Sequence, residues 1–265
     1  MDSHTVPEPG RARERPSQLR LRIEARYSGF PGLALGGYVA GLLAREGGPR
    51  GALEVRLQHP VAIGDDVSVN GDALLRDGVT VASARRIDLR LWPPRAVSRQ
   101  EAEVASASYI GLAHHLFPGC FCCGPGRSAG DGLRIFAGPA AHSMVASPWR
   151  PADAVEEANV PTEILWSALD CPAIWAQVLV TRATGERAVT GSLAVAQLQP
   201  VPARETQLVV GWPIGRDGRK IHVGAAITSE HGVVLAVARQ TLIVTERGVP
   251  LDIEAWQGAP PPEAL

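Results

Sequence analysis

Two polar residues stand in segments whose other residues are mostly apolar. Asp170 lies within a helical pattern over residues 162–178, and Gln240 lies on a strand-like run over residues 233–245. A carboxylate can deprotonate a water molecule, and an amide can hold that water in line for attack. A buried amide also needs hydrogen-bond partners, so Gln240 could instead serve the structure. Asp170 comes just before Cys171-Pro172 and could cap a restarted helix.

A cysteine-rich loop offers a different chemistry. Cys120 and Cys123 have the Cys-x-x-Cys spacing of zinc ligands, and His114, His115 and Cys171 are further donors. A single Cys-x-x-Cys lacks the second pair that makes such a signal strong. We therefore expect a loop of reduced thiols that binds no metal.

The run from Gly126 to Gly130 matches the Gly-x-Ser-x-Gly elbow of serine hydrolases. That elbow needs a strand before it and a helix after it. Here Gly124-Pro125 precedes the run and a strand-like segment, 133–136, follows it. The local pattern therefore argues against a serine nucleophile.

Composition narrows the class of protein. The 265 residues are 45% hydrophobic and 20% charged with a net charge of −1, so there is no basic field to hold nucleic acid or an anionic membrane. No apolar run reaches the roughly 20 residues that a membrane span needs. Residues 1–20 are polar and rich in Pro and Arg, without the apolar stretch of a signal peptide. We expect a cytoplasmic protein with a disordered N-terminal tail.

The elements that must position these side chains occur twice. The first half reads as a helix over 36–46 followed by strands over 53–58, 66–69 and 79–87. The second half reads as a helix over 162–178 followed by strands over 188–198, 207–212, 220–228 and 233–245. Each half also contains an Arg-Asp-Gly turn, at 76–78 and 216–218. The repeated order indicates an internal duplication, and one helix followed by several strands is typical of an α+β unit with an antiparallel sheet.

In this order the segments resemble the double-hotdog acyl-CoA thioesterases of the thioesterase II type. Gly36-Gly37-Tyr38-Val39-Ala40-Gly41 resembles the Gly-Gly opening of the first hotdog helix. Leu75-Arg76-Asp77-Gly78 with Ala84-Arg85-Arg86 resembles the first-half hairpin, and Ala168-Leu169-Asp170 resembles the family's Ala-Ser-Asp. Thr190 lies ten residues before Pro200, and Gln240 lies fifty residues after Thr190. These offsets resemble those of the family's catalytic Thr and Gln. The likeness covers roughly residues 30–90 and 160–245.

The resemblance implies an α+β fold of two tandem hotdog domains, each a long helix wrapped by an antiparallel sheet. It implies an acyl-CoA thioesterase with Asp170, Thr190 and Gln240 as catalytic residues and Gly36 and Gly37 at the substrate. No cofactor or metal is expected. The expected partner is acyl-CoA or a related thioester, not nucleic acid or a membrane, and a homo-oligomer is left open. We expect these segments: a tail (1–20), the N-terminal hotdog (21–92), a Gly/Pro/Cys-rich linker (93–147), the C-terminal hotdog (148–257) and a second tail (258–265).

Several alternatives stay open at this stage. Thr190 is also an ordinary strand residue, and Gly36-Gly37 could form a tight turn with close helix packing. Glu163 lies on the same helix face as Asp170 and is a backup carboxylate. The linker has no counterpart in the family pattern and could close the substrate channel, which would leave a non-catalytic hotdog that binds an acyl group or a protein partner. A hydratase would need an Asp/His pair near the helix, a placement that His142, His222 and His231 lack.

Overall fold

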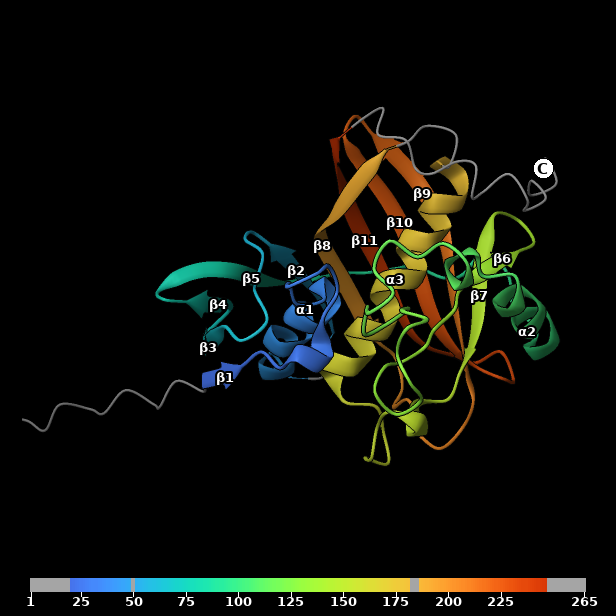
Figure 1. The fold of residues 1–265 in the computed structure, drawn as a ribbon, viewed down its shortest axis with the longest axis horizontal. Helices are drawn as coiled ribbons and strands as arrows, with labels where there is room; N and C mark the ends of the chain where they lie inside the picture. The colour runs from blue at the N-terminus through green and yellow to red at the C-terminus, as the bar shows by residue number, and fades with distance from the viewer. Residues whose placement is uncertain (1–19, 49–50, 182–185, 247–265) are drawn as a thin grey trace, which may run out of the picture.

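The computed structural model describes residues 20–48, 51–181 and 186–246. Over these ranges an eleven-stranded antiparallel sheet carries the long helices on one face (Figure 1). The helices are α1 (Gly36–Glu46), α2 (Arg99–Ala107) and α3 (Thr162–Thr181), with short 3-10 turns at Ala25–Tyr27, Ile110–Leu112 and Pro151–Asp153. The strands are β1 (Arg20–Arg22), β2 (Ala52–Leu57), β3 (Asp66–Asn70), β4 (Ala73–Arg76), β5 (Val79–Ile87), β6 (Gly138–Ala140), β7 (Met144–Trp149), β8 (Arg187–Gln197), β9 (Gln207–Asp217), β10 (Lys220–Ser229) and β11 (Val234–Glu246). The expected tails lie outside the described residues, except that Arg20 begins β1.

The sheet consists of two halves with the same strand order. Outward from its centre, the first half runs β2-β5-β4-β3-β1 and the second runs β8-β11-β10-β9-β7, with β6 added at the edge. α1 precedes the first half's central strand in the chain, and α3 precedes the second's. α1 packs on β2 and β5, whereas α3 packs on β9, β10 and β11. The predicted α+β double hotdog is confirmed.

The internal alignment suggested by the two Arg-Asp-Gly turns is wrong by one hairpin. Residues 76–78 join β4 to β5, whereas residues 216–218 join β9 to β10, which correspond to β3 and β4. β3 and β4 have five and four residues, but β9 and β10 have eleven and ten. Because the β3–β4 hairpin is short, the turn after β4 lies about as far along the first half as the turn after β9 lies along the second half. β4 is a strand that the sequence pattern did not indicate.

The two halves meet at β2 and β8, which pair antiparallel from Leu53 opposite Val195 to Arg56 opposite Ser192. Above this seam α1 and α3 approach each other closely. A Cβ on Gly37 would lie 2.7 Å from the carbonyl oxygen of Trp166, and one on Gly41 would lie 2.5 Å from the Cα of Glu163. Because residues four apart share a helix face, these two glycines form the contact surface that lets the helices cross.

The second-half strands, which are rich in Val, Ile and Ala, are buried on both faces over much of their length. The helix-side core contains Val209, Ala225 and Ala238, packed under α1 and α3. The far-side core contains Val210, Ala226 and Val237, covered by α2 and by Val97 of the preceding segment. α2 thus closes the second face of the sheet.

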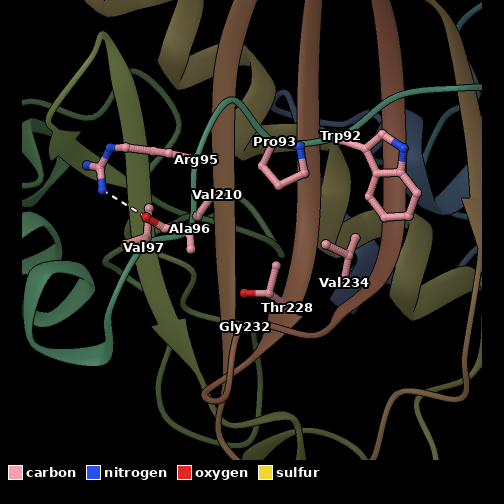
Figure 2. A pocket seen from close by; sticks show the side chains of 9 residues that line it. All are labelled: Trp92, Pro93, Arg95, Ala96, Val97, Val210, Thr228, Gly232 and Val234. Carbon is pink, nitrogen blue, oxygen red and sulfur yellow. Dashed lines mark hydrogen bonds between the residues drawn. The ribbon is translucent and has the colours of Figure 1, made fainter.

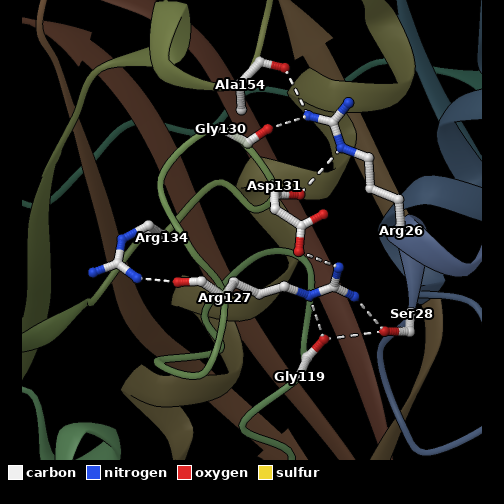
Figure 3. Close-up of polar contacts among 8 residues, drawn as sticks. All are labelled: Arg26, Ser28, Gly119, Arg127, Gly130, Asp131, Arg134 and Ala154. Atoms are coloured by element: carbon white, nitrogen blue, oxygen red, sulfur yellow. Dashed lines mark hydrogen bonds and ion pairs between the residues drawn. The ribbon is translucent and has the colours of Figure 1, made fainter.

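The segment expected to be a linker is built into the fold (Figure 3). The Arg26 guanidinium donates to the carbonyls of Gly130 and Asp131, and Arg127 donates to the Ser28 hydroxyl at 2.7 Å. In addition, the Phe121 N–H donates to the Ser28 carbonyl, and the Phe121 side chain is fully buried. Residues 117–134 are therefore packed on the N-terminal hotdog beside α1.

Candidate functional site

Asp170 lies in the middle of α3, which continues through Pro172 to Thr181. The alternative in which Asp170 caps a restarted helix is therefore wrong, although Pro172 removes one helical N–H donor. The side chain of Asp170 is 1% exposed and points to the first turn of α1. There its Oδ2 accepts a hydrogen bond from the Gly37 N–H at 2.7 Å. Asp170 thus caps α1, whose own N-cap residue, Leu35, makes no side-chain capping bond.

The structure brings Thr190 and Gln240 to the same carboxylate. The Thr190 hydroxyl donates to Asp170 Oδ1 at 3.2 Å, and the Gln240 amide nitrogen donates to the same oxygen. That nitrogen also donates to Thr190 Oγ1 at 2.7 Å. Side chains from α3, β8 and β11 therefore form one hydrogen-bonded group.

A β-bulge turns Thr190 toward α3. Leu193 and Val195 of β8 face the helices, so regular alternation would turn Thr190 to the other face. Between β8 and β11, however, Ser192 pairs with Thr241 and Thr190 pairs with Leu242, which leaves Gly191 as an extra residue. A Cβ on Gly191 would lie 2.7 Å from the Cγ1 of Ile243. Gly191 was not foreseen; the signal available was a glycine inside a strand pattern.

Burial is the main influence on the charge of Asp170. Desolvation raises the pKa of its carboxyl to about 6, and the nearby Cys120 adds to the increase. The hydrogen bonds from Gly37, Thr190 and Gln240 act in the opposite direction and lower the pKa. At neutral pH the group is mainly ionised, and it carries its charge at the positive end of the α1 dipole.

The amide of Gln240 has one polar atom to spare. Gln240 is fully buried, and its Oε1 has no hydrogen-bond partner among the described residues. A buried acceptor without a donor is costly, and a water molecule or ligand group next to Asp170 could satisfy it. The position is therefore suited to holding a small donor against the carboxylate.

Gly36 and Gly37 lie at the start of α1, beside this group. A Cβ on Gly36 would lie 3.5 Å from Asp170 Oδ2 and 3.1 Å from the end of the Leu57 side chain. Gly37 is needed for the close approach of α3, as described above. Glu163, the backup carboxylate, instead forms an ion pair with Arg45 at 3.1 Å.

The competing catalytic motifs are not assembled in the described residues. Ser128 lies in a series of turns, without the strand and helix that an elbow requires. His222 contacts the Thr241 hydroxyl at 3.2 Å, and Thr241 points to the face opposite Gln240 because neighbouring strand residues alternate. Within the described residues, no histidine contacts Asp170, so the Asp/His pair of a hydratase is not formed.

A second polar cluster lies next to this group. Cys171 follows Asp170 in α3, and its sulfur lies 3.7 Å from that of Cys120, which is 3.6 Å from that of Cys123. The Nε2 of His115 lies 3.3 Å from the Cys123 sulfur. Among the described residues, the sulfur atoms of Cys120, Cys123 and Cys171 lie within 4.8 Å of one another and could hold a metal ion.

A shallow pocket lies away from both clusters (Figure 2). It is formed where Trp92, Pro93 and Val97 cross the sheet above Val210 and Val234. Val210 and Val97 belong to the core on the face opposite α3. This hollow therefore does not open onto Asp170.

The fold is that of the thioesterase II double hotdogs. The tesB protein of Mycobacterium avium subsp. paratuberculosis superposes with a TM-score of 0.58, over 88% of this chain and 96% of that chain, at 12% identity. The acyl-CoA thioesterase II of Mycobacterium marinum superposes with a TM-score of 0.54, over 89% and 96%, also at 12% identity. At such identities the likeness establishes the architecture.

Sequence comparison adds nothing to this, because no family profile and no curated protein matches the chain. Among the described helices, none has the length and apolar character needed to cross a membrane.

Proposed function

We propose that the chain hydrolyses acyl-CoA thioesters to a free acid and CoA, through a water molecule that Asp170 activates and Thr190 and Gln240 position. The observation that carries this proposal is the convergence of a hydroxyl and an amide on one buried, mainly ionised carboxylate. A carboxylate held in this way can act as a general base. The double-hotdog architecture adds support, since the similar solved structures include an acyl-CoA thioesterase.

In the proposed reaction the water donates one hydrogen bond to Asp170 and the other to Gln240 Oε1. Its oxygen attacks the thioester carbonyl carbon, its proton passes to Asp170, and the carbonyl electrons move to the oxygen. As the oxyanion collapses, the C–S bond breaks and the proton on Asp170 passes to the leaving sulfur. The products are the carboxylic acid and the CoA thiol, and Asp170 returns to its ionised form.

The N-terminus of α1 is the proposed site for the thioester oxygen. The first N–H groups of a helix have no acceptor inside the helix. That of Gly37 is bound to Asp170, so we assign the Gly36 N–H to the developing oxyanion. The helix dipole favours negative charge there, and the missing Cβ of Gly36 leaves room beside Asp170.

One observation favours the alternative of a non-catalytic binding protein. Asp170 and Gln240 are 1% and 0% exposed, so a thioester must move neighbouring groups to reach them. A hotdog with this group closed could bind an acyl chain or a partner elsewhere and turn nothing over. Catalysis therefore requires that substrate entry opens the space beside Gly36.

The two functions are separated by incubating the protein with acyl-CoA compounds of increasing chain length. Mass spectrometry then follows free CoA, free acid and any product differing by water. Release of CoA and acid by the wild type, greatly reduced in Asp170→Asn, is the expected result. Binding of acyl-CoA by native mass spectrometry without release would overturn the proposal in favour of the binding protein. A product differing by one water would indicate a hydratase.

A further inference from the structure

The four cysteines of the chain are buried free thiols, and three of them converge. Cys120 and Cys123 come from the segment packed beside α1, whereas Cys171 comes from α3. The sulfur atoms of Cys120 and Cys123 are 3.6 Å apart, and those of Cys120 and Cys171 are 3.7 Å apart. A disulfide bond holds its sulfurs about 2.05 Å apart, so these are contacts between separate thiols. The fold thus supplies the third thiol that the single Cys-x-x-Cys pair lacked.

The spacing of the sulfurs is that of a metal site. A tetrahedral zinc ion with Zn–S bonds of about 2.3 Å keeps its thiolate sulfurs about 3.8 Å apart. The separations of 3.6 and 3.7 Å agree with this sulfur–sulfur distance, and all three sulfurs lie within 4.8 Å of one another. A single ion at the centre of this triangle can therefore reach all three without a rearrangement of the backbone.

A nitrogen donor lies at the Cys123 corner of the triangle. The Nε2 of His115 is 3.3 Å from the Cys123 sulfur, and the ring packs against Tyr109 and Trp175. Its Nδ1 accepts the Phe117 N–H at 2.9 Å, which places the ring proton on Nε2. The ring lies outside the group of donor atoms within 4.8 Å of one another, so it must move toward the ion to bind it. Ligation through Nε2 also transfers the ring proton to Nδ1, so the Phe117 contact must open when the ring binds a metal. Neighbouring His114 is exposed.

We propose that Cys120, Cys123 and Cys171 bind one Zn²⁺ ion as thiolates, with His115 as the fourth ligand. Binding releases the three thiol protons to solvent. Three thiolates and one imidazole fill all four positions of the ion, as in structural zinc sites. A catalytic zinc site would keep one position for water. The exposure of the three cysteines, 4%, 3% and 5%, agrees with a site that solvent does not reach.

The location of the site gives the metal a structural task. Cys171 directly follows Asp170 and precedes Pro172, where α3 lacks one backbone donor. A zinc ion would fasten residues 115–123 to α3 at this point and so hold the helix that carries Asp170. The expectation from sequence of a loop without metal is replaced by this proposal.

The test is the metal content of the full chain, grown with added zinc and purified without chelator. Inductively coupled plasma mass spectrometry should find about one zinc per chain. Cys120→Ser, Cys123→Ser and Cys171→Ser should each lose most of it, and His115→Ala should weaken binding in competition with a chromogenic chelator. The matched control is Cys122→Ser, because Cys122 is equally buried in the same segment and its side chain contacts Cys171, but its sulfur is not one of the three that lie within 4.8 Å of one another.

A readout on the unaltered protein covers the case in which a cysteine variant does not fold. The wild type loaded with Co²⁺ should show the visible bands of tetrahedral cobalt and thiolate-to-cobalt charge transfer. Removing zinc with a chelator should lower the melting temperature, and adding zinc should restore it. A zinc-free wild type with four titratable thiols, iron in place of zinc, or a Cys120–Cys123 disulfide would overturn the proposal. So would zinc loss from Cys122→Ser with full retention in His115→Ala. None of these readouts depends on thioester hydrolysis.

Discussion

The carboxylate of Asp170 caps a helix to which it does not belong, because its Oδ2 accepts the N–H of Gly37 in the first turn of α1 at 2.7 Å. This bond joins the central helices of the two hotdogs at one of their close backbone contacts. It also combines the two interpretations of Asp170, since capping and catalysis would use the same carboxylate. Variants at this contact must therefore be examined for stability and for turnover separately.

Asp170→Asn should separate those two roles. The variant keeps the size of the side chain and one acceptor oxygen, but it replaces the other acceptor by an amide donor and removes the base. Gln240 can turn its amide so that Oε1, unpartnered among the described residues, accepts from the new group. We expect a small loss of stability in urea unfolding and a loss of turnover of about 10²–10⁴-fold, the usual contribution of a general base. CoA release at the wild-type rate would leave Asp170 with the capping role alone.

Gly37→Ala should destabilise the fold. The new methyl group would lie 2.7 Å from the Trp166 carbonyl oxygen and 2.8 Å from the Cβ of Asp170, so α1 and α3 must move apart. Overpacking of this kind costs about 1–3 kcal/mol. Gly215→Ala in β9 is the matched control, because its Cβ would meet nothing within 4 Å. Equal urea midpoints for the two variants would contradict the close helix contact.

The architecture could be predicted from sequence because its elements carry regular patterns. α1 was predicted with its observed bounds, and β8 to β11 were placed within a few residues, except that β9 runs five residues further. The short strands β1, β4, β6 and β7 were missed. They have three to six residues, too few for alternation to be distinctive.

The candidate site was predictable to a smaller extent. Asp170 and Gln240 could be singled out as polar residues in apolar elements, whereas Thr190 rested on a resemblance. Nothing in local sequence says that a bulge at Gly191 turns Thr190 toward the helix. The meeting of Cys171 with Cys120 and Cys123 was also hidden, because Cys171 comes 48 positions after Cys123 and the packing of the linker brings them together.

Thr190→Val and Gln240→Leu should lower turnover less than Asp170→Asn, because each removes a positioning group and leaves the base. The two side chains share a hydrogen bond of 2.7 Å, so their effects should not add. A double-mutant cycle on kcat/KM should give a coupling energy of about 0.5–3 kcal/mol, the range for residues in one network. Independent, additive losses would mean that Thr190 and Gln240 do not hold the same water.

Arg127→Met should loosen the segment that carries Cys120 and Cys123. The guanidinium of Arg127 joins the Gly119 carbonyl, the Asp131 carboxylate and the Ser28 hydroxyl at 2.7–2.8 Å (Figure 3). Methionine keeps the apolar stem but removes the donor from the Asp131 carboxylate and the Ser28 hydroxyl, whereas the Gly119 carbonyl keeps a hydrogen bond from Ser28. The expected loss of stability is about 1–3 kcal/mol.

Amide hydrogen exchange offers a local measurement of this loss. The Phe121 N–H, bound to the Ser28 carbonyl at 2.7 Å, should exchange faster in Arg127→Met, whereas amides of the β10–β11 hairpin should exchange with little change. Arg90→Met is the matched control, because the Arg90 side chain is 88% exposed and pairs only with the similarly exposed Asp88 in the described structure. Exposed pairs contribute little to stability, so this control should behave as the wild type. If Arg127→Met showed no faster exchange at Phe121 than the control, the linker would be held by its buried side chains alone and the arginine network would be incidental.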